Sequence, residues 1–483
     1  MEKLPDLTRL TDCEKDTLIS LLWEQNQLLR QKVGQLEARI KQLEDRLAKN
    51  SQNSSKPPSS DGYNKPSPKS RREKGKRSNG GQKGHLGTTL KKVKTPDHII
   101  DHIASNCNGC GNSLKQAKVV NCETRQVFDI PVLKINVTEH RSHRKCCNNC
   151  GAITAGVFPG EACHSVQYGS HIKSLMVYMS QYQLLPYARL REFFNDLFGQ
   201  TVSEGTLANV NNQMHNRLEK TEKRIEKLLI KSSVLHVDET SARVDKKRIW
   251  LHVASTRLLT HYGIHAKRGS EAVDAIGLLP NYNGTLVHDH LKSYFKYGKN
   301  HSLCNAHHLR ELSFIQERYQ CKWAKEMETF LLVTKKRVEA RYEETGKTLS
   351  ERELKRLYNK YKKIVSQGRI ECPSAEKQTT TQKGRLKQSD ARNLLNRLRE
   401  FGGATLAFMF NPRVPFDNNQ AERDIRMTKV KQKVSGCFRS EIGAKIFCRV
   451  RGYVSTMKKN GVGILAALYN AFTNKKIYLP SPA

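Results

Sequence analysis

The chain has 483 residues, and its 84 lysines and arginines against 46 acidic residues give a formal net charge of +38. A charge this one-sided opposes folding through self-repulsion, and a polyanionic partner explains it most simply. No apolar run approaches the ~18 residues of a membrane-spanning helix, and the N-terminus lacks the layout of a signal peptide, so we expect an intracellular protein without a membrane partner. The length predicts roughly three or four modules.

Residues 1–48 are predicted to form a leucine-zipper coiled coil, because a heptad pattern runs from Ile19 to Leu47. β-branched residues at one seam position and leucines at the other favour a parallel two-stranded coil, and Asn26 within the seam fixes its register. Flanking charges such as Lys32 and Glu37, or Arg39 and Glu44, are spaced as partners across such a dimer. We therefore predict a homodimer or a higher assembly. The alternative is an amphipathic helix that packs on its own domain.

Residues 49–94 are polar and strongly basic, with 13 lysines and arginines against two acidic residues. So few apolar side chains cannot bury a core, and we expect a disordered linker. Such segments bind DNA phosphates without sequence preference, whereas a plain solubilising linker, the alternative, leaves the one-sided charge unexplained. The predicted DNA contacts here are Arg71, Arg72, Lys74, Lys76 and Arg77.

Residues 95–160 contain two Cys-x-x-Cys-Gly motifs separated by 36 residues. Four thiolates suit a closed tetrahedral zinc site, and the odd total of 13 cysteines fits metal ligation better than disulfides. The alternating pattern over 126–137 predicts a β-hairpin, so we expect a small β module stapled by structural Zn²⁺. Cys146 offers a competing register for the second motif. The predicted zinc ligands are Cys107, Cys110, Cys147 and Cys150.

Residues 161–230 are predicted to be mostly helical. One amphipathic helix at 187–198, a turn at 199–203 and a second helix at 204–214 fit a helix-turn-helix, whose second helix enters the DNA major groove. Short helix pairs are common, and a pair that only packs is the alternative.

Residues 231–321 begin a predicted α/β catalytic core. Asp238 and Asp289 each end a short apolar run, as expected of buried strands that open onto a site. Three strands, a helix and a further strand, with acids on the first and fourth strands, follow the order of a ribonuclease H-like fold. These elements are predicted at 233–238, 248–254, 258–265, 270–278 and 284–289.

A second metal site is conceivable within this region, where Cys304 lies in a histidine-rich segment. We do not favour it, because these residues lack knuckle spacing and the carboxylates already supply a magnesium site. The histidines are His288, His290, His307 and His308.

Residues 322–403 are predicted to be an all-helical insertion, interrupted by a polar stretch at 367–388. The core then resumes at 404–483, where Asp417 is a plausible N-cap that would put Glu422 in the second turn of a helix. Basic residues follow this glutamate and are natural clamps for a phosphate backbone, although a solvated helix face is the alternative. The predicted DNA contacts are Arg423, Arg426, Lys429, Lys431 and Lys433.

Asp238, Asp289 and Glu422 together would form a strongly negative oxygen cluster that is stable only when cations neutralise it. Two Mg²⁺ or Mn²⁺ ions per site would do so and would support in-line phosphoryl transfer. The simpler alternative is that each strand-end aspartate caps a loop and that Glu422 pairs with Arg426.

Blocks along nearly the whole chain resemble the transposases of insertion sequence 66, which belong to the DDE group. The resemblance implies that Asp238, Asp289 and Glu422 form the metal-binding triad of an element-encoded bacterial transposase, with companion proteins from the same element. Many relatives carry Pro where this chain has Met427, outside the metal site. The blocks are the zipper-like start, Asn-Ser-Ser-Lys-Pro-Pro-Ser-Ser-Asp, Gly-Gly-Gln-Lys-Gly-His, the two cysteine motifs, His-Val-Asp-Glu-Thr, Asp289 with Tyr294, Cys-Asn-Ala-His-His-Leu-Arg-Glu-Leu and Asp-Asn-Asn-Gln-Ala-Glu-Arg.

This resemblance implies action on double-stranded DNA, namely the terminal inverted repeats of the element and a target. Hydrolysis would free a 3′-hydroxyl, which then attacks target DNA, with Asp238 bridging both ions. The expected location is cytoplasmic, at the bacterial nucleoid. Two alternatives remain open: a non-catalytic, sequence-specific DNA-binding regulator with zinc module and zipper, and a nuclease of the same fold without joining activity.

Overall fold

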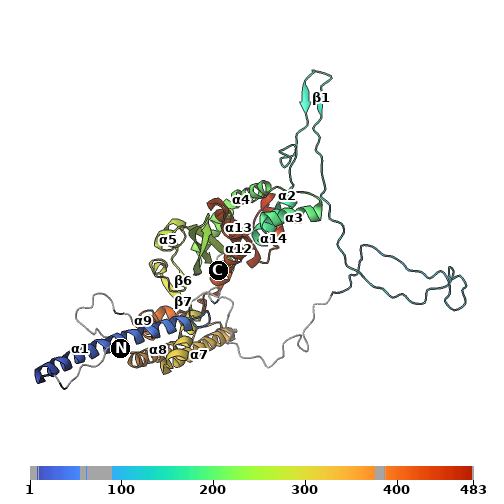
Figure 1. The fold of residues 1–483 in the computed structure, drawn as a ribbon. Helices are drawn as coiled ribbons and strands as arrows, with labels where there is room; N and C mark the ends of the chain where they lie inside the picture. Colours follow the sequence, from blue (N-terminus) through green and yellow to red (C-terminus); the bar gives the residue numbers. More distant parts are fainter. Residues whose placement is uncertain are drawn as a thin grey trace. The chain divides into compact units, whose positions relative to one another are not determined.

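The computed structural model describes residues 8, 10–54, 61, 90–375, 386 and 388–480 (Figure 1). Most of the predicted basic linker lies outside the described residues, including the predicted DNA contacts Arg71, Arg72, Lys74, Lys76 and Arg77. The chain divides into two compact units. The larger comprises 1–68, 166–191 and 202–483, and the smaller comprises 69–165 and 192–201.

A five-stranded mixed sheet forms the centre of the larger unit, with the strand order β5-β4-β3-β6-β7. Strands β3, β4 and β5 pair antiparallel, whereas β6 runs parallel to β3 and β7 runs parallel to β6. The structure places an element at each of the five positions that the sequence predicted. These five elements are β3 (Val234–Val244), β4 (Lys247–Ser255), β5 (Thr260–His265), α5 (Ser270–Ile276) and β6 (Thr285–His288), and the remaining strand of the sheet is β7 (Asn300–Leu303).

Strand β3 is longer than its apolar pattern predicted. Its second half is polar, yet it pairs with β4 along its length as far as Val244. The two strands join through a two-residue turn in which Asp245 and Lys246 have positive φ angles of 44° and 62°. Both central residues of a type I′ hairpin turn adopt this conformation. Pairing with β4, rather than the apolar run, therefore determines where β3 ends.

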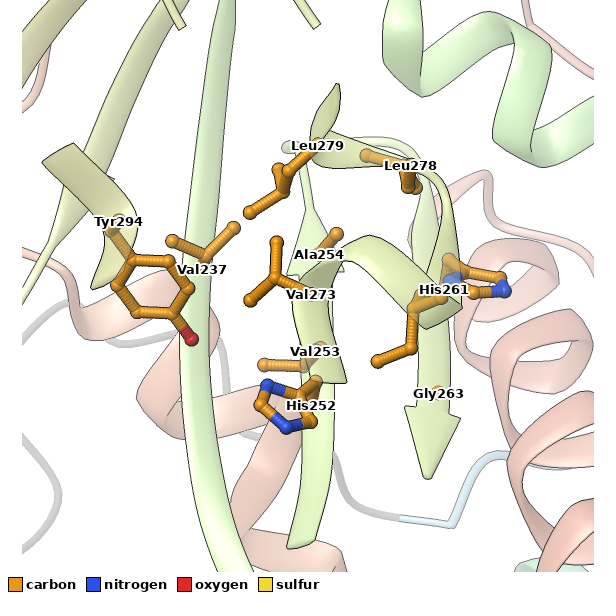
Figure 2. A pocket seen from close by; sticks show the side chains of 11 residues that line it. Val237, His252, Val253, Ala254, His261, Gly263, Val273, Leu278, Leu279 and Tyr294 are labelled. Carbon is orange, nitrogen blue, oxygen red and sulfur yellow. The ribbon is translucent and has the colours of Figure 1, made fainter. Parts of the chain in front are cut away.

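Side chains of the sheet pack into two separate clusters. Val237 of β3 packs in a cluster with Val273 of α5 and Tyr294, and these residues line a small apolar cavity (Figure 2). Ala242 of the same strand belongs to the other cluster, which includes Ala421. Residues of opposite parity on a strand point to opposite faces, so the alternation of β3 places core on both sides of the sheet.

Helices from both ends of the larger unit contact this sheet and one another. Helix α12 contacts β3 and β4, α13 contacts β5 and α4, and α14 contacts α2. Helix α4 was predicted at 204–214 but continues to Ile230, because apolar residues recur on one face along its whole length. The helices are α2 (Ser170–Val177), followed by a π-helical turn (Tyr178–Tyr182), α4 (Glu204–Ile230), α12 (Asn419–Ser435), α13 (Glu441–Lys459) and α14 (Ile464–Phe472).

A second, all-helical core lies between β7 and α12 in sequence. Trp323 and Tyr361 are among its largest buried side chains. The expected interruption at 367–388 begins later than predicted, because α8 continues to Glu371. The helices are α6 (Asn305–Tyr319), α7 (Lys322–Thr345), α8 (Glu351–Glu371), α9 (Asp390–Glu400), α10 (Gly402–Thr405) and α11 (Ala407–Phe410).

The smaller unit contains the two cysteine motifs. Their turns are closely alike: the amide of Gly111 donates to the Cys107 carbonyl, and the amide of Gly151 donates to the Cys147 carbonyl, each at 2.9 Å. Both glycines have positive φ angles, 74° and 71°, which explains why glycine follows each pair. The matching geometry assigns Cys147, rather than Cys146, to the position that corresponds to Cys107.

The β-hairpin predicted at 126–137 is wrong, because the structure has no strand among the described residues 90–143. Two three-residue strands, β1 (Arg144–Cys146) and β2 (Ile153–Ala155), instead flank the second cysteine turn. The apolar side chains that made the alternating pattern are mostly exposed, as in Val127 at 92% and Val132 at 88%. Helix α3 (Tyr187–Phe198) matches its predicted bounds and spans the boundary of the two units.

The N-terminal helix α1 (Asp12–Ala48) begins with a capping box formed by Thr11 and Glu14. None of its described residues is buried. Its last turn contacts α6, where Arg318 pairs with Glu44 and Asp45. Glu44 thus has Arg318 as a partner within its own chain. The predicted contact of Glu44 with Arg39 of a second α1 helix would compete with this ion pair. Among the described residues, no helix is both long and apolar enough to cross a membrane.

Candidate active site

Asp238 and Asp289 come from adjacent parallel strands in matching register. His236 of β3 is the partner of Val287 of β6, and each aspartate lies two residues further along its own chain. Parallel strands with this register bring their carboxyl ends to one edge of the sheet. The two aspartates therefore lie beside each other because of strand pairing, although they are far apart in sequence.

Glu422 reaches the same edge on α12, in the first turn of that helix rather than the second. The predicted N-cap, Asp417, is also displaced by one residue, because Asn418 occupies the cap position. Asn418 makes no side-chain capping bond to the helix. Asp417 instead accepts a hydrogen bond from the amide of Asn419 at 3.1 Å. The Asn418 side chain is free to point into the sheet.

The buried carboxamide of Asn418 joins α12 to both strands. Its nitrogen donates to the backbone carbonyl of Val237 at 2.8 Å and lies 3.4 Å from an Asp289 oxygen. Its oxygen lies 3.0 Å from Nδ1 of His236. The backbone amide of Asn418 also donates to the sulfur of Cys304 at 3.2 Å. The side chain and the backbone amide of this residue thus fix the position of the helix that carries Glu422.

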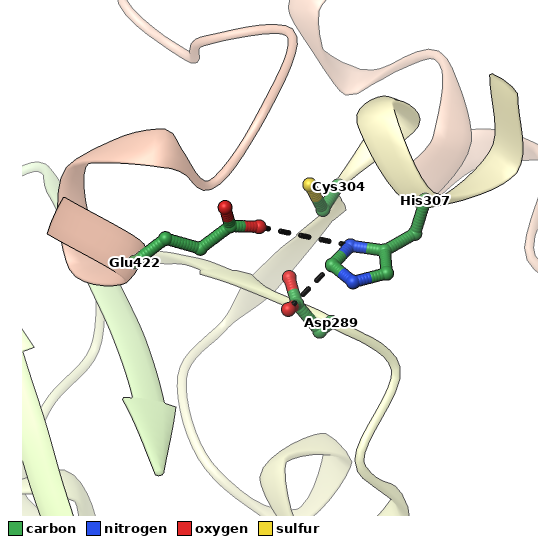
Figure 3. A group of neighbouring side chains, drawn as sticks. All are labelled: Asp289, Cys304, His307 and Glu422. Atoms are coloured by element: carbon green, nitrogen blue, oxygen red, sulfur yellow. Dashed lines mark ion pairs between the residues drawn. The ribbon is translucent and has the colours of Figure 1, made fainter. Parts of the chain in front are cut away.

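A ring of four possible ligand atoms closes the site (Figure 3). Asp289, Cys304, His307 and Glu422 each offer one such atom, and these atoms lie within 4.8 Å of one another. His307 Nδ1 is 3.5 Å from Asp289 Oδ2 and 3.9 Å from Glu422 Oε1. Asp238 is not in this ring; its Oδ1 accepts a hydrogen bond from the Glu239 amide at 2.8 Å.

Burial is the first cause of the raised pKa of each of the three carboxylates. Burial, followed by repulsion from Asp289 and Glu239, raises the pKa of Asp238 well above its usual value. Burial raises the pKa of Asp289 to about 6, although the hydrogen bond from Asn418 lowers it. Burial and then the charge of Asp289 raise the pKa of Glu422. Without a cation, this cluster disfavours its own ionised form.

The residues present fit a divalent cation. The Glu422 and Asp289 side chains are 27% and 25% exposed, so the site is largely desolvated but still open. Glu422 Oε1 and His307 Nδ1 have no hydrogen-bond partner among the described residues, although both atoms are buried. Clustered carboxylate oxygens are the donors that Mg²⁺ and Mn²⁺ prefer. A cation would coordinate the Glu422 oxygen that lacks a hydrogen bond and would relieve the repulsion.

Family comparisons bear on the region that holds this site. Residues 165–446, which include all three acids and more than half of the chain, match the model of the transposase IS66 family. The chain belongs to this family. Residues 104–151 match the zinc-finger binding domain of the same transposase, and residues 2–91 match a family of unknown function. No curated protein matches the chain.

The matched zinc-finger region of the transposase holds both cysteine turns. Hydrogen bonds from the amides of Gly109 and Asn149 lower the thiol pKa of Cys107 and Cys147, respectively, and so favour the thiolates that zinc binds. Among the described residues, the four sulfurs are not gathered within 4.8 Å of one another. Each of the two cysteine turns is formed, but the structure does not bring the sulfurs of the two turns together.

The basic residues of α12 divide into two groups. Arg423, Arg426 and Lys433 are exposed. Lys429 donates to the Ser241 carbonyl at 2.8 Å, and Lys431 lies 5.4 Å from the centre of the Phe438 ring. Burial lowers the pKa of both lysines. These two have contacts within the transposase, so we keep only the exposed three as candidate DNA contacts.

The sequence pattern missed a second layer of residues behind the carboxylates. Glu239, with a side chain only 6% exposed, accepts hydrogen bonds from Tyr294 at 2.7 Å and from Arg268 at 2.7 Å. Asn418 and His307 were likewise not predicted to belong to the site. Asn418 was passed over because the N-cap was assigned to its neighbour Asp417. His307 was passed over because the spacing of the histidines does not match a zinc knuckle. The only indication in the sequence that Glu239 belongs to the site was its position next to Asp238, at the end of a predicted strand.

Proposed function

We propose that this transposase binds the ends of its mobile element and catalyses metal-dependent DNA strand cleavage and strand transfer. The observation that carries the proposal is the meeting of Asp238, Asp289 and Glu422 at one edge of the sheet. The reaction frees a 3′-hydroxyl at each element end, and that hydroxyl then attacks target DNA.

The sheet supports a ribonuclease H-like fold for the catalytic core. Three antiparallel strands followed by two parallel strands, in the order β5-β4-β3-β6-β7, are expected for that fold. The helices from 322 to 403 are an insertion between the second acid and the third. The acids then belong to a DDE triad, with one on the central strand, one after the neighbouring strand and one on a helix.

The three carboxylates would hold two Mg²⁺ or Mn²⁺ ions. When bound, such a pair stabilises the attacking and leaving oxygens of in-line phosphoryl transfer. Asp238, on the central strand β3, would share both ions. Asp289 and Glu422 would each hold one, and Asn418 keeps them in place without supplying a charge of its own.

Double-stranded DNA would be bound by several parts of the chain. Arg423, Arg426 and Lys433 lie on the helix of Glu422, where they can contact the phosphates that flank the scissile bond. The zinc module, stapled through Cys107, Cys110, Cys147 and Cys150, and the helix-turn-helix formed by α3 and α4 are the candidates for recognising the inverted repeats. The basic linker would add contacts without sequence preference.

Assembly would use α1 as a leucine-zipper coiled coil. The exposed seam of this helix, with Leu29 at 60% and Leu36 at 62% exposure, fits a second copy of the chain. The proposal also includes companion proteins of the same element, as the family resemblance implies, and a location at the bacterial nucleoid in the cytoplasm.

A joining assay tests the proposal. Labelled element-end DNA is incubated with the full-length protein, Mg²⁺ and a supercoiled target plasmid. Label transferred to the plasmid is the expected result. Cleavage without transfer identifies a nuclease of the same fold, and binding without either reaction identifies a DNA-binding regulator; both outcomes contradict the proposal.

A further inference from the structure

His307 lies in the first turn of α6, immediately after β7. Its Nδ1 atom points between the carboxylates of Asp289 and Glu422 (Figure 3), at 3.5 Å and 3.9 Å. Both separations exceed a normal hydrogen bond, so the imidazole is directed at the two acids without being bound to either. The imidazole is also near the thiol of Cys304, which contacts Asp289.

Arg310 occupies the other side of the same imidazole. Its guanidinium NH2 lies 3.4 Å from His307 Nε2 and 3.7 Å from Glu422 Oε1. A guanidinium can only donate hydrogen bonds, so its position 3.4 Å from Nε2 favours Nε2 as the accepting nitrogen of the ring. A neutral imidazole has one donor and one acceptor, and its hydrogen must then be on Nδ1. The cationic guanidinium also opposes a second proton on Nε2.

We infer that His307 is a positioning residue whose Nδ1–H, held in that tautomer by Arg310, directs the Asp289 and Glu422 carboxylates toward a shared cation site. The inference rests on the proposed metal-binding function. One N–H facing two acceptors can bond to either, which leaves the remaining oxygen lone pairs of both acids for the cation. Second-layer donors of this kind orient ligands, and their loss typically lowers metal affinity about 10–100-fold.

The competing role for His307 is direct ligation of the cation through Nδ1. That role needs the opposite tautomer, with the hydrogen on Nε2, where it would face the Arg310 guanidinium. Two donors would then oppose each other across 3.4 Å. The two roles differ in whether nitrogen is bound to the metal, which can be measured.

Replacing His307 by an amide residue tests whether its N–H donor matters independently of the imidazole ring. An asparagine carboxamide can place its N–H near the position of Nδ1, whereas a glutamine carboxamide reaches the position of Nε2. Mn²⁺ binding to the full-length protein is measured by titration with detection of free Mn²⁺ for wild type, His307→Asn, His307→Gln and His307→Leu. We expect Asn to stay within about threefold of wild type and Gln and Leu to bind about tenfold or more weakly.

Two controls accompany the titration. His265→Leu removes a histidine from the end of β5 and should leave Mn²⁺ affinity unchanged. Circular dichroism and thermal unfolding establish that each variant folds. Pulsed electron paramagnetic resonance of the Mn²⁺-loaded wild type should show no directly bound ¹⁴N. A bound ¹⁴N that disappears in His307→Leu would overturn the positioning role and establish ligation.

The result also separates this inference from the proposed function. If wild type binds Mn²⁺ and Asp289→Asn weakens binding while His307→Leu does not, the inference is wrong and the carboxylate site stands. If His307→Asn is as weak as His307→Leu, the Nδ1 donor is not what matters and the inference is again wrong. If wild type does not bind Mn²⁺, both are overturned.

Discussion

The carboxamide nitrogen of Asn418 lies 2.8 Å from the backbone carbonyl of Val237, the residue before Asp238. This bond joins the helix that carries Glu422 to the strand that carries Asp238. Asn418 is completely buried, so its polar groups have no access to water. A buried donor and acceptor that satisfy each other fix relative positions more strictly than apolar packing does.

Replacing Asn418 by alanine should therefore destabilise the protein. The Val237 carbonyl would be left buried without its partner, which costs about 1–3 kcal/mol. Urea denaturation measures the free energy of unfolding, and Mn²⁺ titration of the same variant should show weaker binding. Asn419→Ala, at the next and exposed position, is the matched control. Equal stability of the two variants would show that the Asn418 bond does not hold the helix.

Without divalent metal, ionisation of Asp289 should reduce the stability of the protein as the pH rises from about 4 to about 7. The pKa of Asp289 is raised to about 6 by burial in the folded state, whereas an unfolded aspartate titrates near ~3.9. Between these values the folded state binds more protons at Asp289, so the contribution of this residue to the free energy of unfolding decreases with rising pH. The contribution of Asp289 is on the order of 2–3 kcal/mol.

Asp289→Asn provides the comparison for this pH dependence. In the presence of a chelator, the variant should match wild type near about pH 4 and be the more stable protein near about pH 7. Urea denaturation at both pH values measures the difference. Mg²⁺ should then stabilise wild type more than the variant, because only wild type keeps the complete ligand set. Parallel pH profiles for the two proteins would contradict the account.

Asp238 and Asp289 could be predicted from the sequence, because an apolar run that ends in an acid indicates a buried strand whose carboxyl end opens onto a site. The helix start could not be predicted to the residue. Asp417 and Asn418 are both good caps, and the choice depends on whether Asn418 finds partners in the sheet, as it does at the Val237 carbonyl. His307 was discounted for a similar reason, since its neighbours come from other elements.

The alternating apolar residues at 126–137 led to a wrong prediction of a β-hairpin. Such a pattern predicts a strand only where other residues of the protein cover the apolar face. Val127 and Val132 are exposed in the smaller unit, so nothing there stabilises a hairpin. The opposite error occurred in β3, whose polar half from Glu239 onward has no apolar pattern but pairs with β4 throughout. In both cases the presence or absence of a pairing partner determined whether a strand formed, and sequence spacing does not reveal such partners.

Zinc content should distinguish the two adjacent cysteines of the second motif. Cys147 has the same turn geometry as Cys107, whereas Cys146 is the last residue of β1 and its thiol donates to the Gly151 carbonyl at 3.3 Å. Elemental analysis of purified protein should find zinc lost or strongly reduced in Cys147→Ser and retained in Cys146→Ser. The reverse pattern would assign Cys146 as the ligand. Removal of zinc by a chelator should unfold this module selectively.

Charges placed in the α1 seam should prevent self-association. Leu29→Asp with Leu36→Asp puts two carboxylates where a partner helix would pack, so the wild-type dimer or larger assembly should become a monomer. Light scattering coupled to size-exclusion chromatography measures the mass. Gln31→Asp with Ala38→Asp adds the same charge on the outer face and should leave the assembly intact. Monomeric wild type would show that α1 does not mediate assembly.

The most direct test of the proposed reaction is strand joining by wild type and Asp238→Asn side by side. Each protein is incubated with labelled element-end DNA, Mg²⁺ and a target plasmid, and end binding is measured in parallel. Asp245→Asn, in the β3–β4 turn, removes an exposed carboxylate and serves as the control. Wild type and Asp245→Asn should join the label to the plasmid, whereas Asp238→Asn should bind the ends normally but neither nick nor join them. Strand transfer by Asp238→Asn in Mg²⁺ would contradict the assignment of the active site.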